Sequence, residues 1–206
     1  MNRQRYILLL FLICSIDCNL KSQTCNHIDL SNKFDIKTTI QRFKKNDFPD
    51  SCIITAFITS KSNLEIQKII ITSDYLLGDS SFILCNNVRS YITNKNVNVE
   101  VVDNDYGDLI VADFNFDGCD DFAIKREEGG NGGPLYNFYI QDENGFHLDD
   151  FLSNSVIFFP TYFDKNKKTL TTLVHANAYQ LRETIYKLRK KKNNKDKWII
   201  KRQRLI

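Results

Sequence analysis

Short apolar runs, spaced at regular intervals and separated by turn residues, constrain the fold of this 206-residue chain more than any other feature. Aromatic and β-branched residues fill these runs, and several runs alternate apolar and polar positions as half-buried strands do. In one of them, Tyr136, Phe138 and Ile140 share a face. The runs that we expect to form strands are Ile53–Thr59, Leu64–Thr72, Phe82–Cys85, Ser90–Thr93, Val97–Val102, Leu109–Asp113, Phe122–Lys125, Leu135–Gln141, Phe146–Phe151, Leu170–Ala176, Tyr179–Leu188 and Trp198–Arg204.

The connections between these runs are short and rich in Asn, Asp and Gly, which tolerate the dihedral angles of tight turns. Strands that are joined by short polar turns form antiparallel meanders. We therefore predict an all-β fold, an antiparallel meander arranged either as a sandwich or as a propeller-like array. Only Asp35–Lys45 is expected to form a helix, as a short N-terminal helical segment.

The first residues have the features of an export signal. Two arginines precede the apolar run Tyr6–Ile16, which is too short for an ordinary transmembrane helix but suits the core of a signal peptide. We predict a signal peptide over residues 1–23, a single domain over residues 24–206, and a periplasmic or secreted product without a membrane span. A lipid anchor at Cys18 is the alternative, which the residues before that cysteine do not favour.

Four cysteines follow the predicted leader, and their pairing is open. They are Cys25, Cys52, Cys85 and Cys119. An even number of cysteines in an oxidising compartment permits two disulfides, and four cysteines allow three connectivities. Their spacing is unlike that of a compact zinc site. Free buried thiols are the other interpretation.

The strongest chemical signal is a loop rich in oxygen donors between residues 113 and 121. Its predicted metal ligands are the side chains of Asp113, Asn115, Asp117 and Asp121 and the main-chain carbonyl of Cys119. Gly118 permits the sharp turn that such a loop requires. Hard oxygen donors without His or thiolate favour Ca²⁺, and Ile124 at the twelfth position excludes an EF-hand. We predict a calcium site, and a plain turn is the alternative.

Further acidic residues surround this loop in the sequence, and any of them could complete the coordination shell. They are Asp103, Asp105, Asp108, Asp120, Glu127 and Glu128. Acids this dense would repel one another unless a cation lay among them. The glycine-rich segment Gly129–Gly133 comes next and lacks the Lys-Ser/Thr pair of a nucleotide-binding P-loop. We expect it to be a mobile or closely approached loop beside the metal.

The order of these motifs resembles that of a known group of proteins. The loop Asp113–Asp121, the Gly/Asn segment, the aromatic run Tyr136–Tyr139 and the turn Asp142–Phe146 resemble exported bacterial proteins with an FG-GAP or integrin-type calcium loop. One branch of that group comprises periplasmic immunity proteins that inhibit lysozyme-like effectors of type IV secretion. The resemblance covers roughly residues 97–160. It implies a β-rich, propeller-like fold and a peptidoglycan hydrolase as the partner.

Histidine usage argues against an enzyme. His27, His147 and His175 are far apart in the sequence, and neither a zinc-protease motif nor a nucleophile elbow occurs. The small formal charge of +3 gives no reason to expect a nucleic-acid partner. Two functions remain, an inhibitor of a lysozyme-like peptidoglycan hydrolase and a calcium-stabilised surface adhesion or structural module. The Asp113 motif is not repeated along the chain, which favours the inhibitor.

The C-terminal segment Arg182–Arg204 is strongly basic, with eleven Lys and Arg residues against two acids. It is interpreted either as a basic patch for an anionic surface or partner, or as the solvated tip of a hairpin at Lys190–Lys192. We favour the hairpin tip, because neither an aromatic stacking platform nor a recognition helix accompanies the charge.

Overall fold

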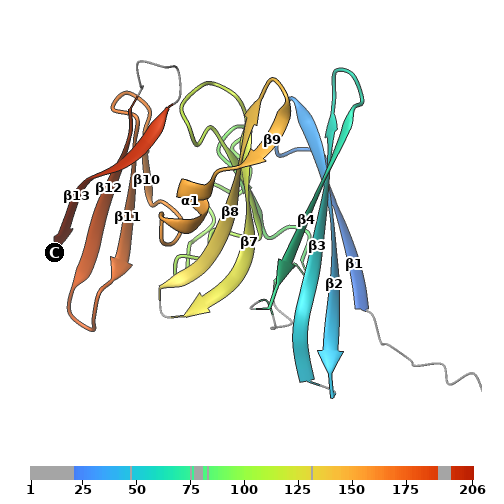
Figure 1. Ribbon diagram of the computed structural model, residues 1–206, viewed down its shortest axis with the longest axis horizontal. Helices are drawn as coiled ribbons and strands as arrows, with labels where there is room; N and C mark the ends of the chain where they lie inside the picture. Colours follow the sequence, from blue (N-terminus) through green and yellow to red (C-terminus); the bar gives the residue numbers. More distant parts are fainter. Residues whose placement is uncertain are drawn as a thin grey trace, which may run out of the picture.

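The chain forms three sheets that follow one another along the sequence. The structure, a computed structural model, describes residues 21–46, 48–74, 76, 81–82, 84–130, 132–189 and 196–206. Figure 1 shows the sheets side by side as layers, with the five-stranded sheet in the middle. Neighbouring strands are antiparallel except β5 and β6, which run parallel. The predicted all-β fold with antiparallel sheets is confirmed.

Each sheet is a consecutive series of strands. The first sheet consists of β1 (Lys21–His27), β2 (Phe34–Lys45), β3 (Phe48–Ser60) and β4 (Ile66–Ser73). The middle sheet consists of β5 (Val88–Ser90), β6 (Leu109–Ala112), β7 (Asp121–Gly130), β8 (Gly133–Asp142) and β9 (Gly145–Leu148). The third sheet consists of β10 (Tyr162–Asp164), β11 (Thr169–His175), β12 (Leu181–Arg189) and β13 (Lys197–Leu205).

The middle sheet is buried on both faces. Its strands β6 and β7 contain unbroken apolar runs, as strands covered on both sides do. Leu109 and Val111 belong to a first core shared with the first sheet, whereas Ile110 and Ala112 belong to a second core shared with the third sheet. The short helix α1 (Asp150–Asn154), which begins after its N-cap Asp149, adds Leu152 to the second core.

Several predicted element boundaries are wrong, and the largest error is at Asp35–Lys45. This segment is not a helix but most of β2, in which Phe34, Ile36, Thr38 and Ile40 are buried at alternate positions. A period of two and several β-branched residues fit an extended strand, and pairing with β1 and β3 stabilises it.

Other expected strands are shorter or absent. The described residues of Phe82–Cys85 form turns, as do the residues of Val97–Val102 apart from one isolated bridge at Val102. The run Phe146–Phe151 is divided between β9 and α1, because the Asp149 carboxylate caps the helix by accepting the Leu152 N–H. Conversely, β1 and β10 were not expected as strands.

The N-terminal strand β1 begins within the predicted leader and carries one of the four cysteines. Residues 1–20 lie outside the described residues, and β1 includes residues 21–23, which were assigned to the leader. A disulfide joins Cys25 of β1 to Cys85, with the two Cα atoms 5.3 Å apart. Cys52 is a buried free thiol and Cys119 a partly exposed one. Within the described ranges, no helix combines the length and apolar character needed to cross a membrane.

A buried charged cluster lies in the middle sheet. Lys125 on β7 has only 2% of its side chain exposed, and its Nζ lies 2.8 Å from Asp105 Oδ2 and 3.0 Å from Asp108 Oδ1. Asp108 is equally buried and also accepts the Phe82 N–H at 2.7 Å. Burial raises the pKa of Asp108, and the Lys125 ammonium opposes that increase. The lysine is therefore the main counter-charge of a buried carboxylate.

Replacing this lysine tests the role of the cluster. We expect Lys125→Met to lower the free energy of unfolding by about 3–5 kcal/mol, because Asp108 would be left buried without its partner. The double variant Lys125→Met/Asp108→Asn should recover part of that loss, since it removes both charges. Chemical denaturation measures both, and a loss below about 1 kcal/mol in the single variant would contradict the assigned role.

A second prediction concerns pH. His27 is buried, with Nε2 3.3 Å from Thr38 Oγ1, and burial is the main cause that lowers its pKa from 6.5 to about 4, assisted by Lys95 and opposed by Asp29. The unfolded chain therefore binds a proton between pH 6.5 and 4 that the folded chain does not. Stability should be complete above pH 6.5 and fall by about 3 kcal/mol as the pH approaches 4. His27→Gln should flatten this slope, and an unchanged slope would contradict the assignment.

Candidate functional site

The predicted metal loop connects β6 to β7 in the middle sheet, and the core fixes its shape. Phe114 is fully buried, in edge-to-face contact with Phe138, and Phe116 packs against Trp198. These two rings are held in the second core. The polar residues that alternate with them, Asp113, Asn115 and Asp117, are therefore free to bond within the loop. Positive φ angles of 59° at Phe116 and 93° at Gly118 complete the turn.

The structure brings Asp113, Asn115 and Asp117 together through a hydrogen-bond network. Asp113 Oδ1 accepts the Asp117 N–H at 2.9 Å, and Asp113 Oδ2 accepts the Gly118 N–H at 3.0 Å. Asn115 Oδ1 also accepts the Asp117 N–H at 3.0 Å, and the Asn115 amide donates to Asp117 Oδ2 at 2.7 Å. The oxygens of three predicted ligands thus gather on the same turn of backbone.

Asp121 occupies a different position from the other acids. Its side chain is completely buried, and its two oxygens accept the N–H groups of Phe114 at 2.8 Å and Gln141 at 2.9 Å. It therefore links the start of the loop to β8. Burial raises its pKa to about 8, and Asp117 and Asp113 contribute to the increase. A cation at this position would offset the cost of burying a negative charge.

Cys119 takes part in the loop through its backbone. Its N–H donates to Asp117 Oδ1 at 2.6 Å, which holds Cys119, two residues after Asp117, on the same turn. Burial raises the pKa of its thiol, and the neighbouring Asp117 adds to this effect. The thiol is thus kept protonated, and the predicted contribution of Cys119 to a metal site remains its carbonyl oxygen.

Of the additional acids considered as ligands, only Asp120 lies at this loop. It accepts Ser31 Oγ at 2.6 Å and lies 3.7 Å from Lys33 Nζ. The other five are Asp103, Asp105, Asp108, Glu127 and Glu128. They precede β6 or follow the first half of β7, so they lie toward the opposite end of the sheet and cannot complete the shell.

The glycine-rich segment also lies at that opposite end, so its expected place beside the metal is wrong. It forms the tip of the β7–β8 hairpin, and β7 is ten residues long, which corresponds to about 30 Å of extended chain. The expected close approach is confirmed at three positions. A side chain at Gly129 would collide with the Gly133 carbonyl, one at Gly132 with the Phe158 ring, and one at Gly133 with the Asp103 carbonyl.

Basic residues that the sequence did not indicate surround the acidic loop. Lys33 donates to the Gly118 carbonyl at 3.2 Å, and Lys168 donates to the Phe116 carbonyl at 3.1 Å. Lys165 Nζ lies 3.6 Å from Asp113 Oδ2. Lys33 precedes Gly118 by 85 residues, and Lys168 follows Phe116 by 52. No local pattern could reveal such distant partners.

The donor set of this loop fits a hard divalent cation. It consists of carboxylate and amide oxygens. Both oxygens of Asp113 and Oδ1 of Asp117 accept backbone N–H groups of one strongly curved segment, and Asp117 Oδ2 accepts the Asn115 side-chain amide. Among the described residues, no three His, Cys, Asp or Glu side chains converge into a metal centre made of these types alone. The predicted site differs from such a centre because it includes an Asn side chain and a backbone carbonyl.

A groove of about 960 Å³ lies beside the loop, between the first sheet and the middle sheet. Its walls are the β3–β4 hairpin, the turn before β2 and the β8–β9 hairpin. Gln67 crosses its base, because its side-chain amide donates to the Phe146 carbonyl and accepts the Phe146 N–H, both at 2.7 Å. Lys33 and Gln141 line this groove and also contact the loop 113–121.

The three histidines lie on β1, β9 and β11, one in each sheet. His27 is buried beside Thr38, and His147 is exposed, with Nε2 2.9 Å from Asp142 Oδ1 at the rim of the groove. The expectation that the protein is not an enzyme stays a prediction.

In comparisons with known proteins, no family, no curated sequence and no solved structure matched this chain.

Calcium binding is the first property to test. We expect titration of chelated protein with CaCl₂ to raise the melting temperature by about 5–10 °C at a hundredfold excess over the dissociation constant. Asp117→Ala should abolish this increase, because it removes the carboxylate that bonds both Asn115 and Cys119.

The matched control is Asp142→Ala, which removes an exposed aspartate that caps a comparable turn by accepting the Asn144 N–H. This variant should bind Ca²⁺ like the unaltered protein. Equal calcium affinity in Asp117→Ala and Asp142→Ala would contradict the site assignment and leave the loop as a plain turn.

Proposed function

We propose that this protein is an exported, calcium-stabilised binding protein whose partner-contacting surface is the groove beside the loop 113–121. The observation that carries the proposal is the shared use of two residues. Lys33 and Gln141 line the groove, and each also bonds the loop, through the Gly118 carbonyl and the Asp121 carboxylate respectively. Any change in the order of the loop would therefore reach the groove directly.

Five residues would hold the cation in this proposal. They are Asp113, Asn115, Asp117, Cys119 through its carbonyl, and Asp121. Bound Ca²⁺ supplies positive charge that neutralises the gathered carboxylates. Asp121 is the residue that transmits order to the groove, because one of its oxygens already holds the Gln141 backbone. Gln141 Oε1 is in addition a buried acceptor without a hydrogen-bond partner.

The groove has the features of a site for a polar macromolecular partner. Two exposed hairpin tips, residues 61–65 and 142–145, form its rim. Asn, Ser, Gln, Lys and acidic side chains line it, together with the apolar side chains of Phe34, Ile58, Ile66 and Phe146. Its base is rigid, because Phe34 and Phe146 meet edge to face with ring centroids 5.0 Å apart and Gln67 ties β4 to β9. Rigid, pre-organised walls lower the entropic cost of binding.

Within this class of function, we propose inhibition of a lysozyme-like peptidoglycan hydrolase. The support for this partner is the resemblance of the loop, the aromatic run and the following turn to the immunity proteins of type IV secretion. A calcium-stabilised adhesion module is the second candidate, and the polar side chains on the two hairpin tips at the rim of the groove are the observation that favours it. An adhesion module would bind glycans without blocking an enzyme.

Inhibition assays with matched groove variants test the proposal. In the presence of Ca²⁺, the protein should block peptidoglycan hydrolysis by a lysozyme-like enzyme. Asn144→Trp, at the exposed tip of the β8–β9 hairpin, should weaken inhibition at least about tenfold by filling the groove, since a buried steric clash costs more than 1.4 kcal/mol.

The control is Asn166→Trp, the corresponding residue of the β10–β11 turn, which lies outside the groove. It should inhibit normally. If neither protein nor variants affect any lysozyme-like hydrolase, but the unaltered protein binds peptidoglycan fragments, the adhesion function replaces the inhibitor. Equal effects of both Trp variants would exclude the groove as the contact surface.

A further inference from the structure

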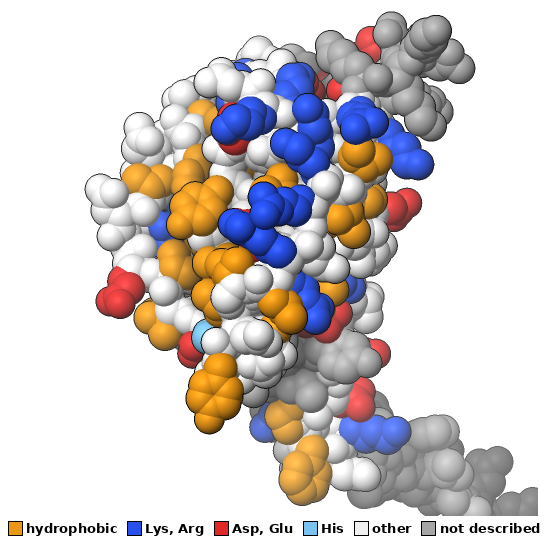
Figure 2. Space-filling model, turned by 90° about the vertical axis from the view of Figure 1, so that its left-hand side faces the viewer, with side chains coloured by type: hydrophobic (Ala, Val, Ile, Leu, Met, Phe, Trp, Pro, Cys, Tyr) orange, Lys and Arg blue, Asp and Glu red, His pale blue; other side chains and the backbone are white. Residues whose placement is uncertain are grey.

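The third sheet has one covered face and one open face. On β12, Thr184, Tyr186 and Leu188 are buried and face the second core. Because side chains alternate along a strand, the residues between them project from the other side of the sheet. Figure 2 looks onto this outer side of the molecule and shows Lys and Arg side chains interleaved with hydrophobic ones.

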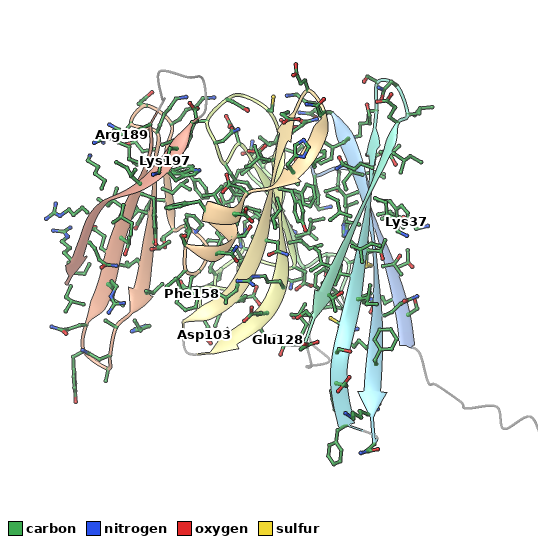
Figure 3. The ribbon with its side chains drawn as sticks, in the orientation of Figure 1. Lys37, Asp103, Glu128, Phe158, Arg189 and Lys197 are labelled. Carbon is green, nitrogen blue, oxygen red and sulfur yellow. A yellow bond between two sulfur atoms is a disulfide. The ribbon has the colours of Figure 1, made fainter. Side chains whose placement is uncertain are left out.

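The strand register identifies the outward-facing residues. The pairs across β12 and β13 on this face are Glu183 with Arg204, Ile185 with Arg202, Lys187 with Ile199, and Arg189 with Lys197. We call this set of eight residues the outer basic face. The two labelled side chains Arg189 and Lys197 lie together near one end of it in Figure 3, on the far side of the molecule from Lys37.

Most of the positive charge on this face is uncompensated. Arg204 forms a two-point ion pair with Glu183, at 2.6 and 3.1 Å. In the described part of the chain, no acidic side chain forms an ion pair with the remaining four cations. These four are Lys187, Arg189, Lys197 and Arg202. They occupy two adjacent strands, which lie about 4.8 Å apart in a sheet.

Apolar side chains are dispersed among these cations. Ile185 and Ile199 lie partly exposed in the centre of the outer basic face. On the same side of the sheet, Tyr162 on β10 lies in register with Ile185 through Thr171 of β11, and it is 63% exposed. The surface therefore combines excess positive charge with exposed aliphatic and tyrosine side chains.

We propose that the outer basic face docks on the surface of an anionic phospholipid membrane. Lys and Arg side chains can lay their aliphatic stems along apolar surface while their charged ends reach phosphate groups. Each such residue near an anionic leaflet strengthens attachment several-fold, and neighbouring aliphatic and tyrosine side chains fit the boundary between head groups and acyl chains. Docking on this face requires no membrane-spanning segment.

Two other anionic partners fit the same charge less well. Interfaces with folded proteins are depleted in Lys and concentrate apolar residues in a central dry patch, whereas here cations and apolar residues alternate. Sequence-independent binding of single-stranded nucleic acid stacks successive bases on several aromatic rings, whereas the eight residues of the outer basic face include none and Tyr162 adds a single ring at its margin. The groove beside the calcium loop belongs to the first and middle sheets, so this inference is independent of the proposed function.

Vesicle co-sedimentation of the full chain tests the inference. The probes are vesicles of phosphatidylglycerol and phosphatidylcholine in equal parts, and vesicles of phosphatidylcholine alone. We expect binding to the first only, and weakening of that binding when NaCl is raised from about 0.1 to 0.5 M, because salt screens exposed charges. The variant Arg189→Glu/Lys197→Glu should bind at least about tenfold more weakly.

The matched control is Lys37→Glu/Lys68→Glu, which changes the net charge by the same amount on the first sheet, where both lysines are exposed. It should bind anionic vesicles like the unaltered protein. Circular dichroism and melting verify that each variant is folded, and Lys187→Gln/Arg202→Gln replaces the first variant if charge reversal prevents folding.

Three results would overturn the proposal. The first is the absence of binding to anionic vesicles, and the second is an equal loss of binding in the test and control variants, which would reflect net charge alone. The third is tighter binding to duplex DNA or to poly-glutamate than to the vesicles, which would assign the face to nucleic acid or to an acidic protein instead.

Discussion

The burial of the middle sheet on both faces is the constraint on which the other features of this structure depend. In β6 four consecutive apolar residues are buried, so both faces of this strand must be shielded from water. The first and third sheets must therefore both be present, and each uses its own apolar face to cover one side of the middle sheet. Lys125 is buried inside this layer, and its ion pairs with Asp105 and Asp108 offset the cost of desolvating its ammonium group.

The same constraint explains why the acidic loop is ordered. The loop begins where β6 ends and finishes where β7 begins, so both of its ends are fixed by strands that cannot move without exposing the cores. Phe114 and Phe116 attach its interior to the second core, and Asp121 attaches it to β8. The result is a concentration of negative charge next to an apolar layer, which Lys33, Lys165 and Lys168 offset only from outside. A cation within the loop would offset it more directly.

Local patterns in the sequence predicted much of the fold and of the loop. Alternation and turn residues identified most strands, and the spacing of Asp113, Asn115 and Asp117 identified three side chains that the structure brings together. The error at Asp35–Lys45 came from giving too little weight to a period of two in a segment with several charged residues. Contacts between segments that are far apart in the sequence could not be predicted from local patterns. The bond from Ser31 to Asp120 spans 89 residues, and the hairpin that carries Gly132 points away from the loop because β7 intervenes.

Charged side chains are distributed unevenly over the three sheets, which the net charge alone does not show. A net charge of only +3 suggests an even surface, yet four cations of the outer basic face have no ion-pair partner among the described residues, whereas the lysines around the acidic loop lie against its carboxylates and carbonyls. The carboxylates of Asp113, Asp117 and Asp121 gather at one end of the middle sheet, whereas the outer basic face lies on the third sheet. Since the two outer sheets can each present only one face to their surroundings, a surface on the third sheet can be engaged while the groove between the first and middle sheets stays accessible. Attachment on one side and recognition on another are thus physically compatible, because no residue of the outer basic face lines the groove.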